Sequence, residues 1–352
     1  MTRFIVRRFL WMLLVLLVVS AITFLLEHSV PGGPFDREKA LPPEIMANLN
    51  QRYHLDESLP QQYIRFLSDV LVPHVSNVPP DTSVQDSAIF NLKIGDKEWL
   101  KWMNFGPSYA SRSRTVNDIL KDQLPISAQL GTMALLVALV VGMPLGILAG
   151  LRQNTIWDYL GMSVAVFGVS VPVIVLGPIL VWIFGVSLKW FPPNGWGASP
   201  PYLLGFLPSH LDWNFFRYAI MPSVALGLGS SAIIARLTRA SLLQVVREDY
   251  IRTARAKGLV ERIVIMRHAM KNSLIPVVTV LGPLFAALVT GTFVTELIFG
   301  IPGMGKYFVT SITNRDYPVI MGTILLYAMF LVVANLVVDI MYAWLDPRIR
   351  YS

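Results

Sequence analysis

The sequence predicts an all-α, polytopic membrane protein with six transmembrane helices. Of its 352 residues, 54% are hydrophobic and only 14% are charged, whereas soluble domains carry about 25% charged residues. Six uncharged stretches are long enough to cross a bilayer, which needs about twenty residues: 9–26, 124–151, 159–188, 218–235, 272–295 and 317–338. The chain contains no cysteine, which excludes disulfides, thiolate nucleophiles and Cys-ligated metals.

The basic residues gather on one side of these six stretches. Segment 236–271, between the fourth and fifth stretches, holds nine Lys or Arg against three acids. Further arginines precede the first stretch, separate the second from the third and follow the sixth: Arg3, Arg7, Arg8, Arg152, Arg348 and Arg350. Because basic loops stay on the cytoplasmic side, we expect both termini and segment 236–271 in the cytoplasm. Much of the net charge of +7 is then a topology signal, and nucleic-acid binding is not expected.

The first transmembrane helix is expected over residues 5–27. Its basic start is also typical of a signal peptide, but the apolar stretch is longer than usual and no small-residue cleavage site closes it, so we interpret it as a retained helix. Residues 28–123 are expected outside the membrane. They contain two amphipathic helical patterns, with stripes formed by Ile45, Leu49 and Tyr53, and by Tyr63, Phe66, Leu67 and Val70.

The remaining five helices are expected to form a transmembrane core over residues 124–345, followed by a cytoplasmic tail, 346–352. Gly142, Gly146 and Gly150 recur every four residues in the second stretch, and such small residues let membrane helices approach closely. Pro172 and Pro178 allow kinks in the third stretch.

Segment 236–271 predicts a helix, a glycine break and a second helix. Three apolar residues of the first helix recur at helical spacing: Val246, Tyr250 and Ala254. Glu248 and Asp249 lie in the first turn, where the helix dipole favours acids, and Gly258 follows where a left-handed residue ends a helix. The second helix, 261–272, carries Ile263, Met266 and Met270. A tight connector needs only about two to eight residues, so these thirty-six indicate docking on a partner.

One sequence pattern in this segment identifies a family. The residues DYIRTARAKGL (249–259), RHA (267–269) and Pro276 resemble the EAA-type coupling loop of ABC importer permeases, in the variant of the peptide and nickel uptake subfamily. The general pattern has Glu at the position of Arg252 and Leu-Pro thirteen residues after the glycine, and this chain has neither. FGPSY (105–109) and TVNDIL (115–120) are most similar to the B-type permease of oligopeptide importers, whereas 72–104 is interpreted as an insertion.

The resemblance implies a single permease domain, 1–352, with the type I ABC importer fold and a non-catalytic role. It implies that the helix of segment 236–271 inserts into a groove of a cytoplasmic ATPase subunit. The expected coupling residues are Glu248, Asp249, Tyr250, Arg252, Thr253, Ala254, Arg255, Lys257, Gly258, Arg267 and His268. The expected outer gate or binding-protein contact comprises Glu296, Pro302, Gly303, Tyr307, Arg315, Asp316 and Tyr317.

The resemblance also implies the partners. They are a second homologous permease, two ATPase subunits, an extracytoplasmic peptide-binding protein and membrane lipid. ATP and Mg²⁺ are expected on the ATPase subunits, with no cofactor on this chain. The implied function is import of oligopeptides or dipeptides across a bacterial inner membrane, and the alternative cargoes are nickel, haem and glutathione.

Several patterns resemble other kinds of site. Gly300–Lys306 reads G-x-x-x-x-G-K, but Tyr307 stands where a phosphate-binding loop needs Ser or Thr. Asp339 lies inside a span and would suit a proton relay, although an ion pair with Arg236 or Arg239 is the preferred interpretation. The five histidines are dispersed, without metal-ligand spacing. A proton-coupled secondary transporter would need more buried carboxylates and an inverted repeat, and a hydrolase a nucleophile beside a base.

Overall fold

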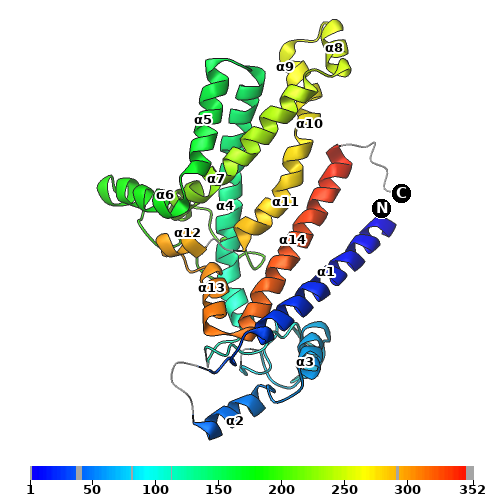
Figure 1. Ribbon diagram of the computed structural model, residues 1–352, viewed down its shortest axis with the longest axis vertical. Helices are drawn as coiled ribbons and strands as arrows, with labels where there is room; N and C mark the ends of the chain where they lie inside the picture. The colour runs from blue at the N-terminus through cyan, green and yellow to red at the C-terminus, as the bar shows by residue number, and fades with distance from the viewer. Residues whose placement is uncertain (1, 37–41, 81, 112, 291–292, 346–352) are drawn as a thin grey trace. The chain divides into compact units, whose positions relative to one another are not determined.

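The computed structural model describes residues 2–36, 42–80, 82–111, 113–290 and 293–345, and it is mostly helical (Figure 1). The long helices are α1 (Thr2–Ser29), α4 (Val116–Leu151), α7 (Trp213–Val245) and α14 (Tyr317–Leu345). The shorter ones are α2 (Pro43–Arg52), α3 (Leu59–Leu71), α5 (Ile156–Ser170), α6 (Val173–Leu180), η1 (Val181–Ser187), α8 (Asp249–Ala256), α9 (Glu261–Ile263), η2 (Val264–Ala269), α10 (Met270–Ser273), α11 (Ile275–Val289), α12 (Phe293–Ile298) and α13 (Gly305–Asn314). The expected tail, 346–352, lies outside the described residues.

The chain divides into two compact units. The first comprises Met1–Phe9, Pro125–Gly303 and Phe330–Ser352, and the second comprises Leu10–Leu124 and Met304–Met329. Segment 236–271 therefore belongs to the first unit. The expected gate residues are divided between the two, because the boundary falls between Gly303 and Met304.

Four described helices are long and apolar enough to cross a membrane: Val6–Ser29, Val116–Leu151, Trp213–Val245 and Tyr317–Met341. Two bent helix pairs raise the number to six if each pair counts as one span. The third predicted stretch is one such pair and bends by 99° between Ser170 and Val173. Val171 is extended there because a residue that precedes proline avoids the helical conformation. Where the sequence predicted a kink, the helix is therefore broken at Pro172.

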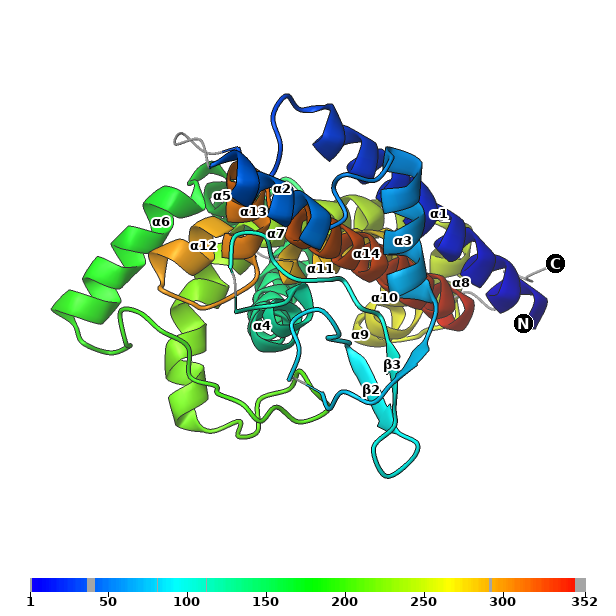
Figure 2. The same cartoon turned by 90° about the horizontal axis from the view of Figure 1, so that it is seen from below.

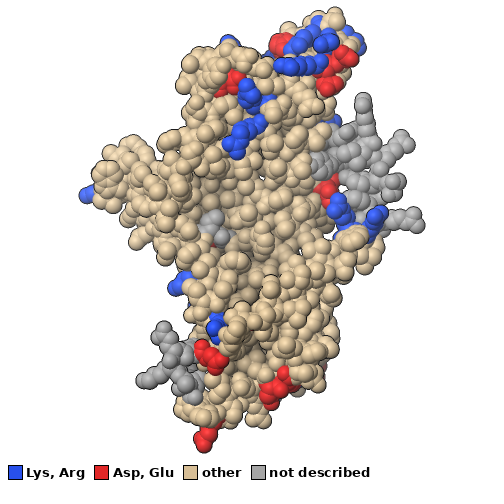
Figure 3. Space-filling view, in the orientation of Figure 1, with Lys and Arg blue, Asp and Glu red and all other residues tan. Residues whose placement is uncertain are grey.

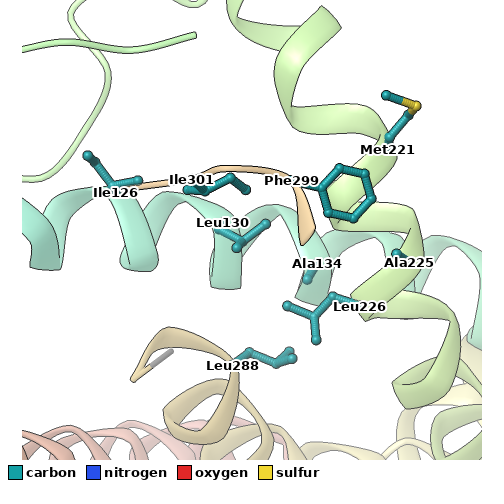
Figure 4. Packing of buried hydrophobic residues seen from close by; sticks show 9 residues of the cluster. All are labelled: Ile126, Leu130, Ala134, Met221, Ala225, Leu226, Leu288, Phe299 and Ile301. Carbon is teal, nitrogen blue, oxygen red and sulfur yellow. The ribbon is translucent and has the colours of Figure 1, made fainter. Parts of the chain in front are cut away.

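The core of the first unit lies where α4, α7, α11 and the residues after α12 meet (Figure 4). Ile126, Leu130 and Ala134 recur every four residues and so lie on one face of α4. The other buried members are Met221, Ala225, Leu226, Leu288, Phe299 and Ile301. This cluster brings the chain segment just after Glu296 against the middle of two long helices.

The predicted glycine stripe of α4 contacts α7. A Cβ atom on Gly142 would lie 2.6 Å from the Ser231 carbonyl oxygen, and one on Gly146 would lie 2.5 Å from the Ala235 carbonyl oxygen. Gly150 continues the contact beside Leu242. The prediction that these glycines permit close helix packing is confirmed.

Arg239 and Asp339, in the long helices of the first unit, each form an ion pair, and the partner of Asp339 differs from the prediction. Arg239 donates from Nε and Nη2 to the two Asp158 carboxylate oxygens, each at 2.7 Å, and so joins α7 to α5. Asp339 lies 2.7 Å from Arg8 Nη2. The predicted pairing of Asp339 with Arg236 or Arg239 is wrong because Asp158 holds Arg239 and Arg8 reaches Asp339.

The second unit contains α2, α3 and a small antiparallel sheet, so the chain is not purely α-helical (Figure 2). Strands β1 (His74–Ser76), β3 (Trp99–Trp102) and β2 (Phe90–Lys93) lie in that order, with Leu100 opposite Val75 and Leu92. The predicted stripe of α3 is confirmed: Val70 is buried and Tyr63, Phe66 and Leu67 are half-buried. The stripe predicted for α2 is wrong at Ile45, whose side chain is exposed, whereas Met46, Leu49 and Tyr53 are half-buried.

Asp86 is the centre of a polar cluster beside this sheet. The fully buried ammonium of Lys101 donates to the Asp86 Oδ2 at 2.9 Å, and His74 Nε2 lies 2.8 Å from Oδ1. Ser76 donates its hydroxyl to the same carboxylate. Burial alone would raise the pKa of Asp86, but the hydrogen bonds from Ser76, His74 and Lys101 together lower it below 3.8.

We expect Asp86→Asn to lower the free energy of local unfolding of the sheet by about 3 kcal/mol, because it leaves the buried Lys101 charge uncompensated. Since the folded-state pKa of Asp86 is lowered, the carboxylate stabilises the sheet above its unfolded pKa of 3.8, and this stabilisation is lost as the pH falls through the folded-state pKa. Hydrogen exchange of the strand amides measures both effects. Equal protection in Asp86→Asn and wild-type chains would contradict the assignment.

Candidate functional site

The coupling segment, residues 236–271, begins on the last turns of α7 and folds back through α8. Glu248 is extended at the start of α8, and the helix ends at Ala256. Gly258 then adopts a φ of +75°, a left-handed conformation that glycine enters without steric cost. The predicted break at Gly258 is confirmed.

Two residues of α8 are buried against the rest of the segment. Ile251 is fully buried and Ala254 is 6% exposed, and both contact a cluster that contains Leu242 of α7 and Val264 of η2. The predicted stripe of Val246, Tyr250 and Ala254 is wrong at Tyr250, whose side chain is exposed. Residues 246 and 247 form a turn, so the spacing of four does not continue from Val246 into α8. The Tyr250 hydroxyl instead accepts a hydrogen bond from Asn272 Nδ2 at 2.8 Å.

The second half of the coupling segment contains the π-helical turn η2 between α9 and α10. Val264, Ile265, Ala269 and Met270 are buried, whereas Ile263 and Met266 are exposed. A π-turn bonds residue i to i+5 and so rotates the following residues around the axis. The face predicted from α-helical spacing is therefore wrong except at Met270.

The exposed face of the segment combines bases with apolar side chains. On the face shown in Figure 3, charged side chains gather over α8. Among the expected coupling residues, the bases with exposed side chains are Arg252, Arg255, Lys257 and Arg267, and His268 is half-buried. Arg255 donates to both Glu261 oxygens, at 3.1 and 2.7 Å, and so joins the helices on either side of Gly258.

The two remaining expected coupling residues of α8, Asp249 and Thr253, make contacts within the helix. The Thr253 hydroxyl donates to the Asp249 carbonyl oxygen at 2.9 Å, and the Asp249 carboxylate lies 3.4 Å from Arg252. The exposed large apolar residues are Tyr250, Leu259, Val260, Ile263 and Met266. Apolar residues rimmed by charges suit the docking of a protein surface. The side chains named here do not place a nucleophile beside a base, as a hydrolytic site would.

The expected gate residues of the first unit lie around the buried carboxylate of Glu296. Glu296 is 2% exposed and accepts a hydrogen bond from the Ser127 hydroxyl at 2.7 Å. A Cβ atom on Gly303 would overlap both the Glu296 carboxylate and the Ser127 hydroxyl. Pro302 lies in the turn between Ile301 and Gly303. The motif 300–306 follows helix α12 rather than a strand, so its fold differs from that of a phosphate-binding loop.

Among the expected gate residues of the second unit, Asp316 binds a loop from much earlier in the chain. This carboxylate, 3% exposed, accepts hydrogen bonds from the Ser108 hydroxyl and from the backbone N–H groups of Tyr109 and Ala110, at 2.9 and 3.2 Å. Arg315 has a left-handed φ of +52° at the end of α13. Burial, then the nearby Glu27 and Asp316 carboxylates, raise the pKa of Tyr109 above its ordinary value, so its ring stays neutral.

Two tyrosines complete this group. The Tyr307 hydroxyl accepts from Arg114 Nη1 at 3.1 Å. Tyr317 is buried and its ring lies 4.9 Å from that of His28 and 6.4 Å from that of Tyr109. The second unit thus brings Asp316 and Tyr317 together with the loop around Tyr109 and with His28, both far earlier in the chain.

We expect Asp316→Ala to destabilise the second unit by about 3 kcal/mol, because each buried donor left without an acceptor costs about 1–3 kcal/mol. Asp316→Asn keeps one acceptor oxygen and should lose less. Thermal unfolding of the purified variants gives the comparison, and hydrogen exchange at residues 108–111 localises the effect. If Asp316→Ala unfolds at the wild-type temperature, the three hydrogen bonds do not stabilise this loop.

Sequence reasoning missed several residues of these sites. Ser127 and Tyr109 touch the predicted gate carboxylates from distant parts of the chain, and no local pattern marks them. Glu27 could have been noticed, because it is an acid placed directly after an apolar stretch. Asp158 likewise lies at the edge of a stretch.

The chain is similar to known transport proteins over nearly its whole length. Residues 142–351 match the family described as "Binding-protein-dependent transport system inner membrane component", and residues 1–81 match its N-terminal family. The dipeptide transport system permease DppB of Bacillus subtilis is 41% identical over 99% of this chain and 98% of its own. The oligopeptide transport system permease OppB of Salmonella typhimurium is 38% identical over the full length of both chains. A solved structure of the methionine ABC transporter MetNI aligns with 64% of this chain and 94% of its own, with 15% identity and a TM-score of 0.46.

Proposed function

Since the chain belongs to the family of binding-protein-dependent transport system inner membrane components, we propose that it forms half of a translocation pore and couples to ATPase subunits through segment 236–271. The family and the full-length relatives make it an ABC peptide importer permease and a multi-pass inner-membrane protein. The proposed assembly contains a second homologous permease, two cytoplasmic ATPase subunits that bind ATP and Mg²⁺, and an extracytoplasmic peptide-binding protein.

The likeness to peptide permeases over the whole chain is the observation that carries this proposal. Relatives named for dipeptide and for oligopeptide transport are 41% and 38% identical. We propose oligopeptides as the cargo, with dipeptides as the second candidate. Nickel, haem and glutathione importers of the same type are the alternatives that a transport assay separates.

The geometry of α8 supports its role as the coupling helix. Ile251 and Ala254 fix one face of α8 to the permease, while Asp249 and Arg252, with side-chain exposures of 96% and 72%, leave the opposite face available to a partner. The exposed part of α8 is thus mainly charged, with Tyr250 as an exposed apolar side chain, and the inner face is apolar. A helix held in this way can transmit a push without any chemistry of its own.

Burial also supports a route for that movement. The cluster around Ile251 includes Leu242 of α7 and Met270 of α10, which leads into α11. A displacement of α8 therefore acts on two membrane helices at once. In the proposed mechanism, closure of the ATPase subunits moves α8, the helices rock, and the pore opens alternately to each side.

The proposal includes a topology of six spans with both termini in the cytoplasm. It also assigns the loops around Glu296 and Asp316 to the outer side, as a gate or as a contact for the peptide-binding protein. The clustering of nine bases in segment 236–271 supports the cytoplasmic side for α8.

Single cysteines test the coupling and the topology together, because the chain contains no native cysteine. Arg252→Cys should crosslink to an ATPase subunit and resist an impermeant thiol reagent added outside. Leu204→Cys, on an 83% exposed side chain in the connector 189–217, should show the opposite behaviour. Outside labelling of Arg252→Cys, or its failure to crosslink in the assembled complex, would overturn the coupling proposal.

Uptake measurements test the cargo. A strain that lacks this chain should lose ATP-dependent uptake of a labelled pentapeptide and regain it on complementation, and unlabelled pentapeptide should compete better than dipeptide. Preferential competition by dipeptide would favour that cargo instead. Uptake driven by an ion gradient without ATPase subunits would identify a secondary transporter.

A further inference from the structure

The second unit contains a cavity that the coupling mechanism does not use. Its volume is about 320 Å³, and its wall comes from the end of α1, from α3, from the loop around Tyr109 and from the start of α14. This volume is at the lower end of small-molecule binding sites, which span about 300–1,000 Å³. The cavity is therefore large enough for a small organic ligand.

Glu27 brings a buried carboxylate to this wall. Its side chain is only 4% exposed, and Oε2 has no hydrogen-bond partner among the described residues. Oε1 lies 3.8 Å from His28 Nδ1, a distance too long for a hydrogen bond. A buried carboxylate oxygen without a donor is costly, so the site favours a ligand that supplies one.

His28 adds a second buried acceptor next to the first. Its Nδ1 lies 2.8 Å from the Phe24 carbonyl oxygen, which can only accept, so Nδ1 carries the proton. In the neutral ring Nε2 is then an acceptor, and it too is buried without a partner in the described part of the chain. Two neighbouring unsatisfied acceptors call for a group with several N–H donors.

Aromatic rings line the same cavity. His28 lies 4.2 Å from the ring of Phe24 and 4.9 Å from that of Tyr317, and Tyr109 lies 4.8 Å from Tyr53. The faces of such rings attract organic cations. The ring cluster therefore favours the same kind of ligand as the two acceptors do.

The other charged groups on the wall restrict the ligand further. Asp69 lines the cavity with two arginines. Arg65 is already held by Glu57, whereas Arg52 lies 5.9 Å from the centre of the Tyr53 ring and is exposed. A simple cation would be repelled by Arg52, but a zwitterion can place its anionic group there.

We propose that this cavity binds the primary ammonium group of a small zwitterion, with Glu27 as its counter-ion. Two sources share this chemistry, the amino terminus of a short peptide and the headgroup of phosphatidylethanolamine. The assignment concerns the second unit alone, so it does not depend on the proposed coupling to ATPase subunits.

Calorimetric titration of the full chain in phosphatidylcholine nanodiscs tests the proposal without ATP or transport. Choline headgroups carry no N–H donor, so they leave the site free. Glycylglycine should bind saturably, whereas N-acetylglycylglycine, which lacks the ammonium, should not. Glu27→Gln, which removes the charge at nearly constant volume, should weaken glycylglycine binding at least tenfold, and Glu27→Asp should restore part of it.

Glu98→Gln is the matched control, because Glu98 is an exposed carboxylate of the same unit and is not in the cavity wall. It should bind glycylglycine as the wild type does, and the unfolding temperatures of all variants show that they are folded. In nanodiscs with phosphatidylethanolamine, native mass spectrometry distinguishes the second source: retention by the wild type but not by Glu27→Gln assigns the lipid. Equal binding of glycylglycine and its N-acetyl form, wild-type binding by Glu27→Gln, or no binding and no lipid retention would each overturn the proposal.

Discussion

Replacing Gly258 by valine is expected to reduce ATP-driven peptide uptake about tenfold while the chain still inserts into the membrane. Gly258 has a φ of +75°, and a residue with a side chain costs about 1–2 kcal/mol in this left-handed region. A cost of about 1.4 kcal/mol corresponds to a tenfold change in an equilibrium constant. Apart from Gly258 and its two chain neighbours, no described heavy atom lies within 4 Å of a Cβ built at this position, so the cost comes from the backbone and not from a clash. The loop should relax to another conformation and move α9 away from α8. Uptake of labelled peptide, divided by the amount of chain in the membrane, measures the effect.

Gly205→Val provides the control for this substitution. Gly205 also has a positive φ, +79°, and open space around the added Cβ, but it lies outside segment 236–271. Its substitution should strain a loop equally without changing uptake per molecule. Normal uptake by Gly258→Val would show that the end of α8 does not need its left-handed residue.

Gly146→Ala is expected to lower the stability of the first unit by about 1–3 kcal/mol, the usual cost of overpacking. The added methyl group would lie 2.5 Å from the Ala235 carbonyl oxygen and 2.7 Å from Thr238 Cβ, so α4 and α7 would have to separate. Thermal unfolding of the purified chain in detergent measures the loss.

Gly229→Ala is the matched control on the partner helix. Its added methyl group meets a first neighbour, the Gly168 carbonyl oxygen, only at 3.8 Å, and alanine favours a helix over glycine by about 1 kcal/mol. This variant should unfold at the wild-type temperature or above it. A Gly146→Ala chain as stable as Gly229→Ala would show that the close contact of α4 with α7 is not needed.

Local sequence patterns predicted much of this fold. The helical stretches, the glycine stripe of α4 and the end of α8 at Gly258 follow from composition, spacing and the conformational freedom of glycine, which act over a few residues. The strands were missed because none is longer than four residues, too short for an alternating pattern. The π-turn after Ile263 moved the buried face of the second helix, and nothing in the local pattern indicates such a turn.

Long-range pairs could not be predicted in the same way. Asp316 binds a loop more than two hundred residues earlier in the chain. Arg239 pairs with Asp158 and not, as the sequence had predicted, with Asp339. Such pairings depend on which helices become neighbours, and a single sequence with six apolar stretches allows many arrangements. The same reasoning explains why the carboxylate of Glu27 could be located in the sequence but its cavity could not.

The ion pair between Asp158 and Arg239 has a mechanical consequence. It fixes the beginning of α5 to α7, and Gly168 near the other end of α5 lies directly against the Leu228 backbone. The two helices are thus fixed to each other near both ends of α5 and should move as one rigid body. A rearrangement of this part of the permease can then bend at the break at Pro172, so a substitution that stiffens this break should slow transport.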